Sequence, residues 1–230
     1  MVSYSVAAGP GNPTLSGSGA TRTFSYTPAA VGNLVLFMAA WQPSTATLSN
    51  FSCSNMNLFY YSSSTPDTGQ VPSGTTLAWQ GYAGVPVSTT TQTATYTLSA
   101  TITFLNIDYI EIAPQAGIES PGNWYWNQLQ HVGSSSSTIT FDNPPRSTQD
   151  GFYVGWCYVG SPPASAGSSS GFTYFYDSTT EDQWAYNMGY KSSAVVPTST
   201  QNSAATFFTR SGIIYYLQEW IPSPLGYGSF

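Results

Sequence analysis

The run of eight apolar residues from Leu34 to Trp41 is the feature that most restricts how this chain can fold. In an extended segment, Leu36 and the other even-numbered residues share one face, while Phe37 and the other odd-numbered residues share the opposite face. A strand that is apolar on both faces has to be covered on both faces. The run is also far shorter than the roughly 18 apolar residues of a membrane-spanning helix. We therefore expect a central, buried strand and no insertion into a membrane.

The rest of the composition favours strands and turns over helices. Charged residues make up only 6% of the 230 residues, whereas aromatic residues make up 16%. Ser and Thr take the place of the Glu, Lys and Arg that coat exposed helix faces. The 21 Gly and 16 Pro supply turn positions. These counts predict an all-β protein with few, short helices and a surface that consists mostly of hydroxyl groups.

Charge and apolar content exclude several classes of protein. Four Lys+Arg against ten Asp+Glu leave a net charge of −6, which excludes a basic nucleic-acid-binding surface. A hydrophobic content of 41% at low charge excludes a disordered chain. The segment Met1 to Val6 lacks the basic start and apolar core of a secretory signal, so we expect synthesis in a cytoplasm.

Strand candidates follow one another along the chain and are joined by segments rich in Gly, Pro, Ser and Asn. In Gln92 to Leu98, Thr alternates with larger residues, so this strand should face water on its Thr side. Ile102 to Ile112 is long enough for a helix, but its β-branched residues favour a strand. The other candidates lie at residues 21–27, 56–61, 75–82, 123–131, 137–141, 152–159, 172–177, 183–191 and 204–220.

Many short strands without helical periodicity predict a single antiparallel β-sandwich, most simply of the jelly-roll type. The length suits one all-β domain, which we place at residues 20–220. Residues 1–19 are predicted to form an N-terminal extended arm or a loosely held edge, and residues 221–230 a C-terminal arm. No internal repeat with a fixed period is evident in the sequence.

Both arms contain Pro and Gly, so neither can form a stable helix. Each arm nevertheless carries apolar side chains, which would gain no burial if the arm stayed in solvent. We expect at least one arm to lie along a neighbouring subunit, with a floppy tail as the alternative. The arm residues expected to make such contacts are Tyr4, Leu225, Tyr227 and Phe230.

Cysteines and acidic residues give little sign of a metal or cofactor. Cys53 and Cys157 are too few for a disulfide scaffold and lack the clustered spacing of a zinc site, so we expect both to be small buried residues. Whether they form a bridge stays open. Calcium is the one metal that Asp177, Glu181 and Asp182 could hold, but no EF-hand spacing is present. The sequence therefore predicts no metal and no cofactor.

Two possible catalytic arrangements fail on chain order or geometry. Ser169 lies in a Gly-x-Ser-x-Gly pattern within a Ser/Gly loop, and the chain's one histidine, His131, precedes it instead of following it. Asp108 and Glu111 could serve as a pair of carboxylates for glycoside hydrolysis. A spacing of three, however, puts them on opposite faces of a strand. We expect a protein that is not an enzyme.

Aromatic residues offer candidate contact surfaces. Trp124, Tyr125 and Trp126 form one set, and Tyr174 and Tyr176 form another. Both sets could stack on sugar rings or lie at a subunit interface, and we favour core or interface for the Trp pair. A third stripe on one strand face is assigned to the core and consists of Trp184, Tyr186, Met188 and Tyr190.

Two parts of the chain show the same order of strands and turns. The first contains Thr23 to Trp41 and Ala94 to Ile112, and the second contains residues 150–160, 172–177 and 213–217. This order resembles the jelly-roll domains of structural proteins of tailed bacteriophages, which serve as minor tail, tail-fibre and capsid-decoration subunits. The resemblance covers residues 20–220 and includes no catalytic signature, so it transfers no functional residue to this chain.

The resemblance implies a non-enzymatic virion protein that is made in the host cytoplasm and docks on other virion subunits. The many aromatic residues and the low charge predict a homo-oligomer or dependence on a partner. The resemblance makes a trimer the first expectation, and contact with host-surface carbohydrate stays open. The alternative is a carbohydrate-binding module of a secreted protein, and a glycosidase is a remote third. Tail and capsid locations are not distinguished by the sequence.

Overall fold

The computed structural model of the chain describes residues 5–61, 67–70, 76–113, 124–132, 138–140, 151–159, 163–165, 172–177, 182–190, 198–201 and 207–216. All regular secondary structure in these residues consists of β-strands, seventeen in number. The described residues contain no helix that could span a membrane. The prediction of an all-β protein is therefore confirmed.

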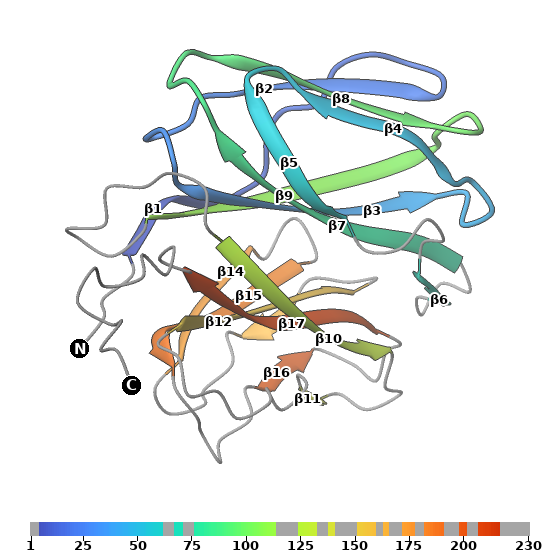
Figure 1. Cartoon of the computed structure of the whole chain (residues 1–230). Coiled ribbons are helices and arrows are strands. Elements are labelled where there is room, and N and C mark those ends of the chain that lie inside the picture. The colour runs from blue at the N-terminus through green and yellow to red at the C-terminus, as the bar shows by residue number, and fades with distance from the viewer. Residues whose placement is uncertain are drawn as a thin grey trace, which may run out of the picture.

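The strands of the first half of the chain, residues 5–113, form two antiparallel sheets that pack against each other (Figure 1). The larger sheet has the order β1-β9-β3-β7-β5, and β6 also pairs with β7. The smaller sheet has the order β2-β8-β4. This arrangement confirms the predicted β-sandwich, while the jelly-roll order of strands stays a prediction. The strands are β1 (Ser5–Gly11), β2 (Thr21–Tyr26), β3 (Leu34–Gln42), β4 (Leu48–Cys53), β5 (Met56–Tyr61), β6 (Asp67–Gln70), β7 (Thr76–Pro86), β8 (Gln92–Leu98) and β9 (Phe104–Ala113).

The second half, residues 124–216, forms another pair of sheets with the orders β10-β17-β12-β15-β14 and β11-β16-β13. If β6 is set aside, each strand here has the same neighbours as its counterpart in the first half. The strand order thus repeats within the chain, although the sequence shows no repeat of fixed period. The strands are β10 (Trp124–Val132), β11 (Thr138–Thr140), β12 (Gly151–Val159), β13 (Pro163–Ser165), β14 (Thr173–Asp177), β15 (Asp182–Tyr190), β16 (Thr198–Gln201) and β17 (Phe207–Tyr216).

The larger sheet of the first half is covered on both faces (Figure 1). Every residue from Leu34 to Trp41 on β3 is at most 6% exposed. The odd-numbered side chains, including Phe37, pack with Phe24 and Tyr96 of the smaller sheet. The prediction of a central strand buried on both faces is confirmed. Two aromatic contacts between the sheets illustrate this packing. The ring centroids of Phe24 and Phe37 lie 5.7 Å apart, and those of Tyr96 and Trp41 also lie 5.7 Å apart.

The described part of the N-terminal arm lies along its own sheet. Residues 5–11 form the outer strand β1, which pairs antiparallel with β9 through two irregularities in register. A Cβ added at Gly9 would lie 2.7 Å from the carbonyl oxygen of Tyr109, and the φ angle of Gly9 is +76°. Only glycine suits this close approach. The sequence left open whether this segment is an extended arm or a loosely held edge, and in the structure residues 5–11 form an edge strand of the sheet. Tyr4 and residues 217–230 lie outside the described residues.

Candidate functional site

The outer face of the smaller sheet carries a ladder of hydroxyl groups. Odd-numbered residues of β2 and β8 point away from the core, because Phe24, Tyr26, Ala94, Tyr96 and Leu98 at even positions are buried in it. The alternation predicted for β8 is therefore confirmed. Three cross-strand pairs make up the hydroxyl ladder, namely Thr21 with Thr97, Thr23 with Thr95, and Ser25 with Thr93.

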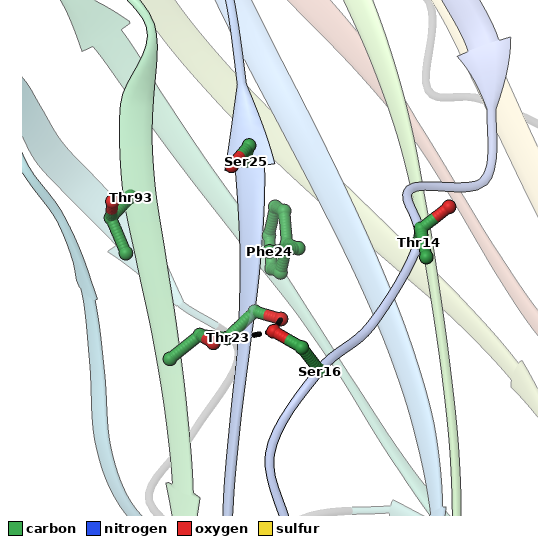
Figure 2. Close-up of a pocket in the computed structure, with 6 residues that line it drawn as sticks. All are labelled: Thr14, Ser16, Thr23, Phe24, Ser25 and Thr93. Carbon is green, nitrogen blue, oxygen red and sulfur yellow. Dashed lines mark hydrogen bonds between the residues drawn. The ribbon is translucent and has the colours of Figure 1, made fainter.

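A hollow of about 580 Å³ opens at the edge of this ladder, between β2 and the segment that runs from Thr14 to Ser16. Figure 2 shows that the lining residues come from three stretches of chain, two of them close in sequence and the third, at Thr93, far from both. We call this feature the hydroxyl hollow, because five of its six lining residues carry a hydroxyl group. They are Thr14, Ser16, Thr23, Ser25 and Thr93, and the sixth is Phe24.

Hydrogen bonds hold the two walls of the hollow together. The backbone N–H of Ser16 donates to the carbonyl of Thr23 at 2.8 Å, and the N–H of Thr23 donates back at 2.9 Å. The Ser16 and Thr23 hydroxyl oxygens lie 2.9 Å apart and share a further hydrogen bond. The hollow is thus formed by the fold itself and does not depend on mobile side chains alone.

The backbone of Ser25 adds polar groups to the same side of β2. Backbone groups of alternate residues in an antiparallel strand point the same way. Since both groups of Thr23 point away from β8 toward Ser16, those of Ser25 point away from β8 as well. No other backbone group in the described part of the chain pairs with them. The hollow therefore combines hydroxyl groups with one N–H donor and one C=O acceptor, and none of its lining side chains is titratable.

Glu111 is a fully buried carboxylate that organises the loop between β2 and β3. It is 0% exposed and accepts hydrogen bonds from the hydroxyl of Tyr26 and from the backbone N–H of Ala29 at 3.0 Å. The N–H of Ala30 and the amide of Asn33 donate to it at 3.3 and 2.6 Å. Burial, together with the hydrogen bond to Glu111, raises the pKa of Tyr26 well above its ordinary value. These contacts give Glu111 a structural role.

Asp108 is buried on the other face of β9 and contacts the second half of the chain. It is 1% exposed and accepts hydrogen bonds from Asn106 at 2.8 Å and from the indole N–H of Trp156 at 3.2 Å. The prediction that Asp108 and Glu111 lie on opposite faces is confirmed. The two carboxylates therefore do not share a cleft.

The other predicted polar sites are only partly described. Cys53 is a free, buried thiol that donates to the side-chain carbonyl of Gln92 at 3.1 Å, so the bridge to Cys157 does not form. Burial raises the pKa of the Cys53 thiol to about 11. Among the described residues, no three or more His, Cys, Asp and Glu side chains gather as a metal site would require. Glu181 and Ser169 lie outside the described residues.

The two predicted aromatic sets are not brought together. Trp124, Tyr125 and Trp126 lie on β10, at one edge of the larger sheet of the second half. Tyr174 and Tyr176 lie on β14, at the opposite edge of that sheet. They cannot form one contact surface along a single edge. The hydroxyl hollow was not predicted, although alternating Thr in residues 21–27 and 91–97 signalled the hydroxyl face on which it lies.

What the fold defines is an all-β sandwich protein whose described buried acids serve its architecture. No family model matches this chain, and no curated protein or solved structure was found to be similar to it. The resemblance to tailed-phage jelly-roll proteins therefore stays a prediction.

Proposed function

We propose that this chain is a non-enzymatic structural subunit of a tailed-phage virion, built in the host cytoplasm and docked on other virion subunits. The observation that supports it is a group of exposed apolar side chains at one end of the first sandwich. Val31 is 49% exposed, Leu58 is 38% exposed and Val87 is 50% exposed. We call these three residues the apolar end patch.

Backbone contacts place Val31 and Val87 on neighbouring loops, and Leu58 lies on the strand next to them. The N–H of Gly32, next to Val31, donates to the carbonyl of Pro86 at 3.1 Å. Val87 follows Pro86 directly and donates its own N–H to the carbonyl of Asn55 at 2.9 Å. Leu58 lies on β5, the outer strand of the larger sheet, where it pairs with Gly84. In the described part of the chain, the patch therefore lies beside the outermost strand of the larger sheet.

Apolar side chains beside a strand edge are suited to subunit docking. An exposed edge offers backbone groups for pairing, and apolar residues exposed together mark interaction sites. Completing the burial of each partly exposed side chain would contribute on the order of 1 kcal/mol. The low charge of the chain leaves association to apolar contacts and neutral hydrogen bonds. We expect a homo-oligomer, with a trimer as the first possibility to test.

The test compares two charge substitutions on one background. Val87→Asp places one charge in the apolar end patch, and Thr97→Asp places the same charge on the hydroxyl ladder as the control. Sedimentation velocity should show an oligomer for the wild type and the control, but a monomer for the patch variant with an unchanged circular dichroism spectrum. A wild-type chain that stays monomeric and binds no other virion protein would overturn the proposal.

Genomic context distinguishes the virion subunit from the alternative, a carbohydrate-binding module of a secreted protein. Genes for portal or tape-measure proteins next to this gene would support the virion subunit. Genes for secreted polysaccharide-degrading enzymes in the same position would support the module instead.

A further inference from the structure

We propose that the hydroxyl hollow is a binding site for a neutral saccharide. Its lining hydroxyl groups converge from three segments, namely Thr14 to Ser16, Thr23 to Ser25 on β2, and Thr93 on β8. The site shares no residue with the apolar end patch, so this inference is independent of the proposed subunit function. It also differs from the aromatic sets on β10 and β14.

The lining of the hollow argues against other classes of ligand. No charged side chain lines it, so neither an anion nor a cation would find a compensating charge. An apolar ligand would remove water from the hydroxyl groups outside the Ser16–Thr23 hydrogen bond, at a cost of about 1–3 kcal/mol for each group left unpaired. The remaining class is an uncharged molecule with many hydroxyl groups.

A sugar meets the requirements of these groups. Each Ser or Thr hydroxyl can donate one hydrogen bond and accept others, as each sugar hydroxyl can. The backbone N–H and C=O of Ser25 provide one fixed donor and one fixed acceptor on the same side of β2. Phe24 is 2% exposed and packs into the core, so hydroxyl and backbone groups would make the contacts with the sugar. The volume of about 580 Å³ lies within the range of small-molecule sites.

The hollow is also preorganised, which lowers the entropy lost on binding. The backbone bridge between Ser16 and Thr23 and the hydrogen bond between their hydroxyls fix the two walls before any ligand arrives. Beyond the hollow, the hydroxyl ladder continues through Thr95 and Thr97 on β8. A longer chain of sugars would therefore meet the same neutral chemistry along the sheet, and we expect an oligosaccharide to bind more tightly than its single unit.

The binding test uses saturation-transfer NMR with named probes. The neutral probes are the methyl glycosides of glucose, galactose and mannose together with N-acetylglucosamine, and the charged probes are sialic acid and galacturonic acid. The wild type should transfer saturation to at least one neutral probe and not to the charged ones. Absence of transfer to every neutral probe, or equal transfer to the charged probes, would overturn the assignment.

Three hydroxyl variants, with Trp124→Ala as a fourth for comparison, locate the site. Thr23→Val and Ser25→Ala each remove one hydroxyl from the hollow, and Thr97→Val removes one from the ladder outside it. Each hollow variant should weaken binding of the single-unit probe about tenfold, which corresponds to about 1.4 kcal/mol. Thr97→Val should leave that binding unchanged. An equal loss in all three variants, or a loss with Trp124→Ala and none with Ser25→Ala, would refute the site.

Discussion

Asp108 and Glu111 lie three residues apart on β9 and accept hydrogen bonds on opposite faces of the same sheet. Asp108 accepts from Trp156 of β12, and Glu111 accepts from Tyr26 of β2. One strand thus contacts the smaller sheet above it and the second half of the chain below it (Figure 1). Carboxylates used in this way stabilise the stacking of the layers.

Glu111→Gln should lower the free energy of unfolding by about 2–4 kcal/mol, because charge-assisted hydrogen bonds are lost and the new amide N–H groups face other donors. Urea unfolding followed by circular dichroism measures this loss. Tyr26→Phe and the double variant complete a cycle, and the two sites should show a coupling energy of at least about 0.5 kcal/mol. Strictly additive losses would contradict the contact between them.

Trp156→Phe should loosen the contact between the two halves, because it removes the indole N–H that donates to buried Asp108. The expected loss of stability is about 1–3 kcal/mol. Hydrogen exchange should accelerate in β12 and on the neighbouring part of β9. Trp41→Phe is the matched control, since Trp41 donates to the carbonyl of Ala46 within the first half. If both variants accelerate exchange in β12 equally, Trp156 has no special role there.

The stability of the fold should fall as the pH rises above about 10, the ordinary pKa of tyrosine. Burial raises the pKa of Tyr26 and of Tyr96 in the folded protein, so the folded state holds protons that the unfolded state loses. Stability is then fully present below the unfolded pKa and is lost with increasing pH. Tyr26→Phe should make this decline less steep in urea titrations at pH 8 and about pH 11. An unchanged slope would show that Tyr26 does not contribute.

Cys53 should be unreactive toward Ellman's reagent at pH 8 in the folded protein. Its thiol is buried and has a pKa of about 11, so roughly one molecule in a thousand carries the reactive thiolate at that pH. The experiment uses a Cys157→Ser background, so that only Cys53 reports. Denaturant should release one thiol per chain. Complete labelling of the folded protein within minutes would contradict the burial of Cys53.

Association through the apolar end patch should be insensitive to salt, because none of its three residues is charged. Sedimentation velocity at about 0.05 and 0.5 M salt should give the same oligomer. Dissociation at the higher concentration would mean that ion pairs hold the subunits together.

Local sequence patterns predicted the features that depend on the two-residue period of a strand. The apolar run in β3 specified burial on both faces, and alternating Thr in β8 specified a hydroxyl face. The same period placed Asp108 and Glu111 on opposite faces of β9. Each of these follows from geometry within one strand, because successive side chains must point to opposite sides.

These local patterns did not predict which distant segments pair with each other. The described part of the Gly- and Pro-rich N-terminus forms strand β1 against β9, about a hundred residues further along the chain. The matching strand orders of the two halves are likewise a property of pairing. Backbone hydrogen bonds make these pairs, and every residue except proline offers the same backbone groups.

By itself, the sequence determined that this protein is built of strands, which strand lies at the centre and which face of β8 carries hydroxyl groups. Only the tertiary structure decided that the segment with Thr14 and Ser16 runs beside β2 and lines one hollow together with Thr93. The periodicity of a strand sets the face that each side chain takes. The segment that comes to lie beside that face depends on long-range pairing and loop paths, which residue patterns within a strand do not encode.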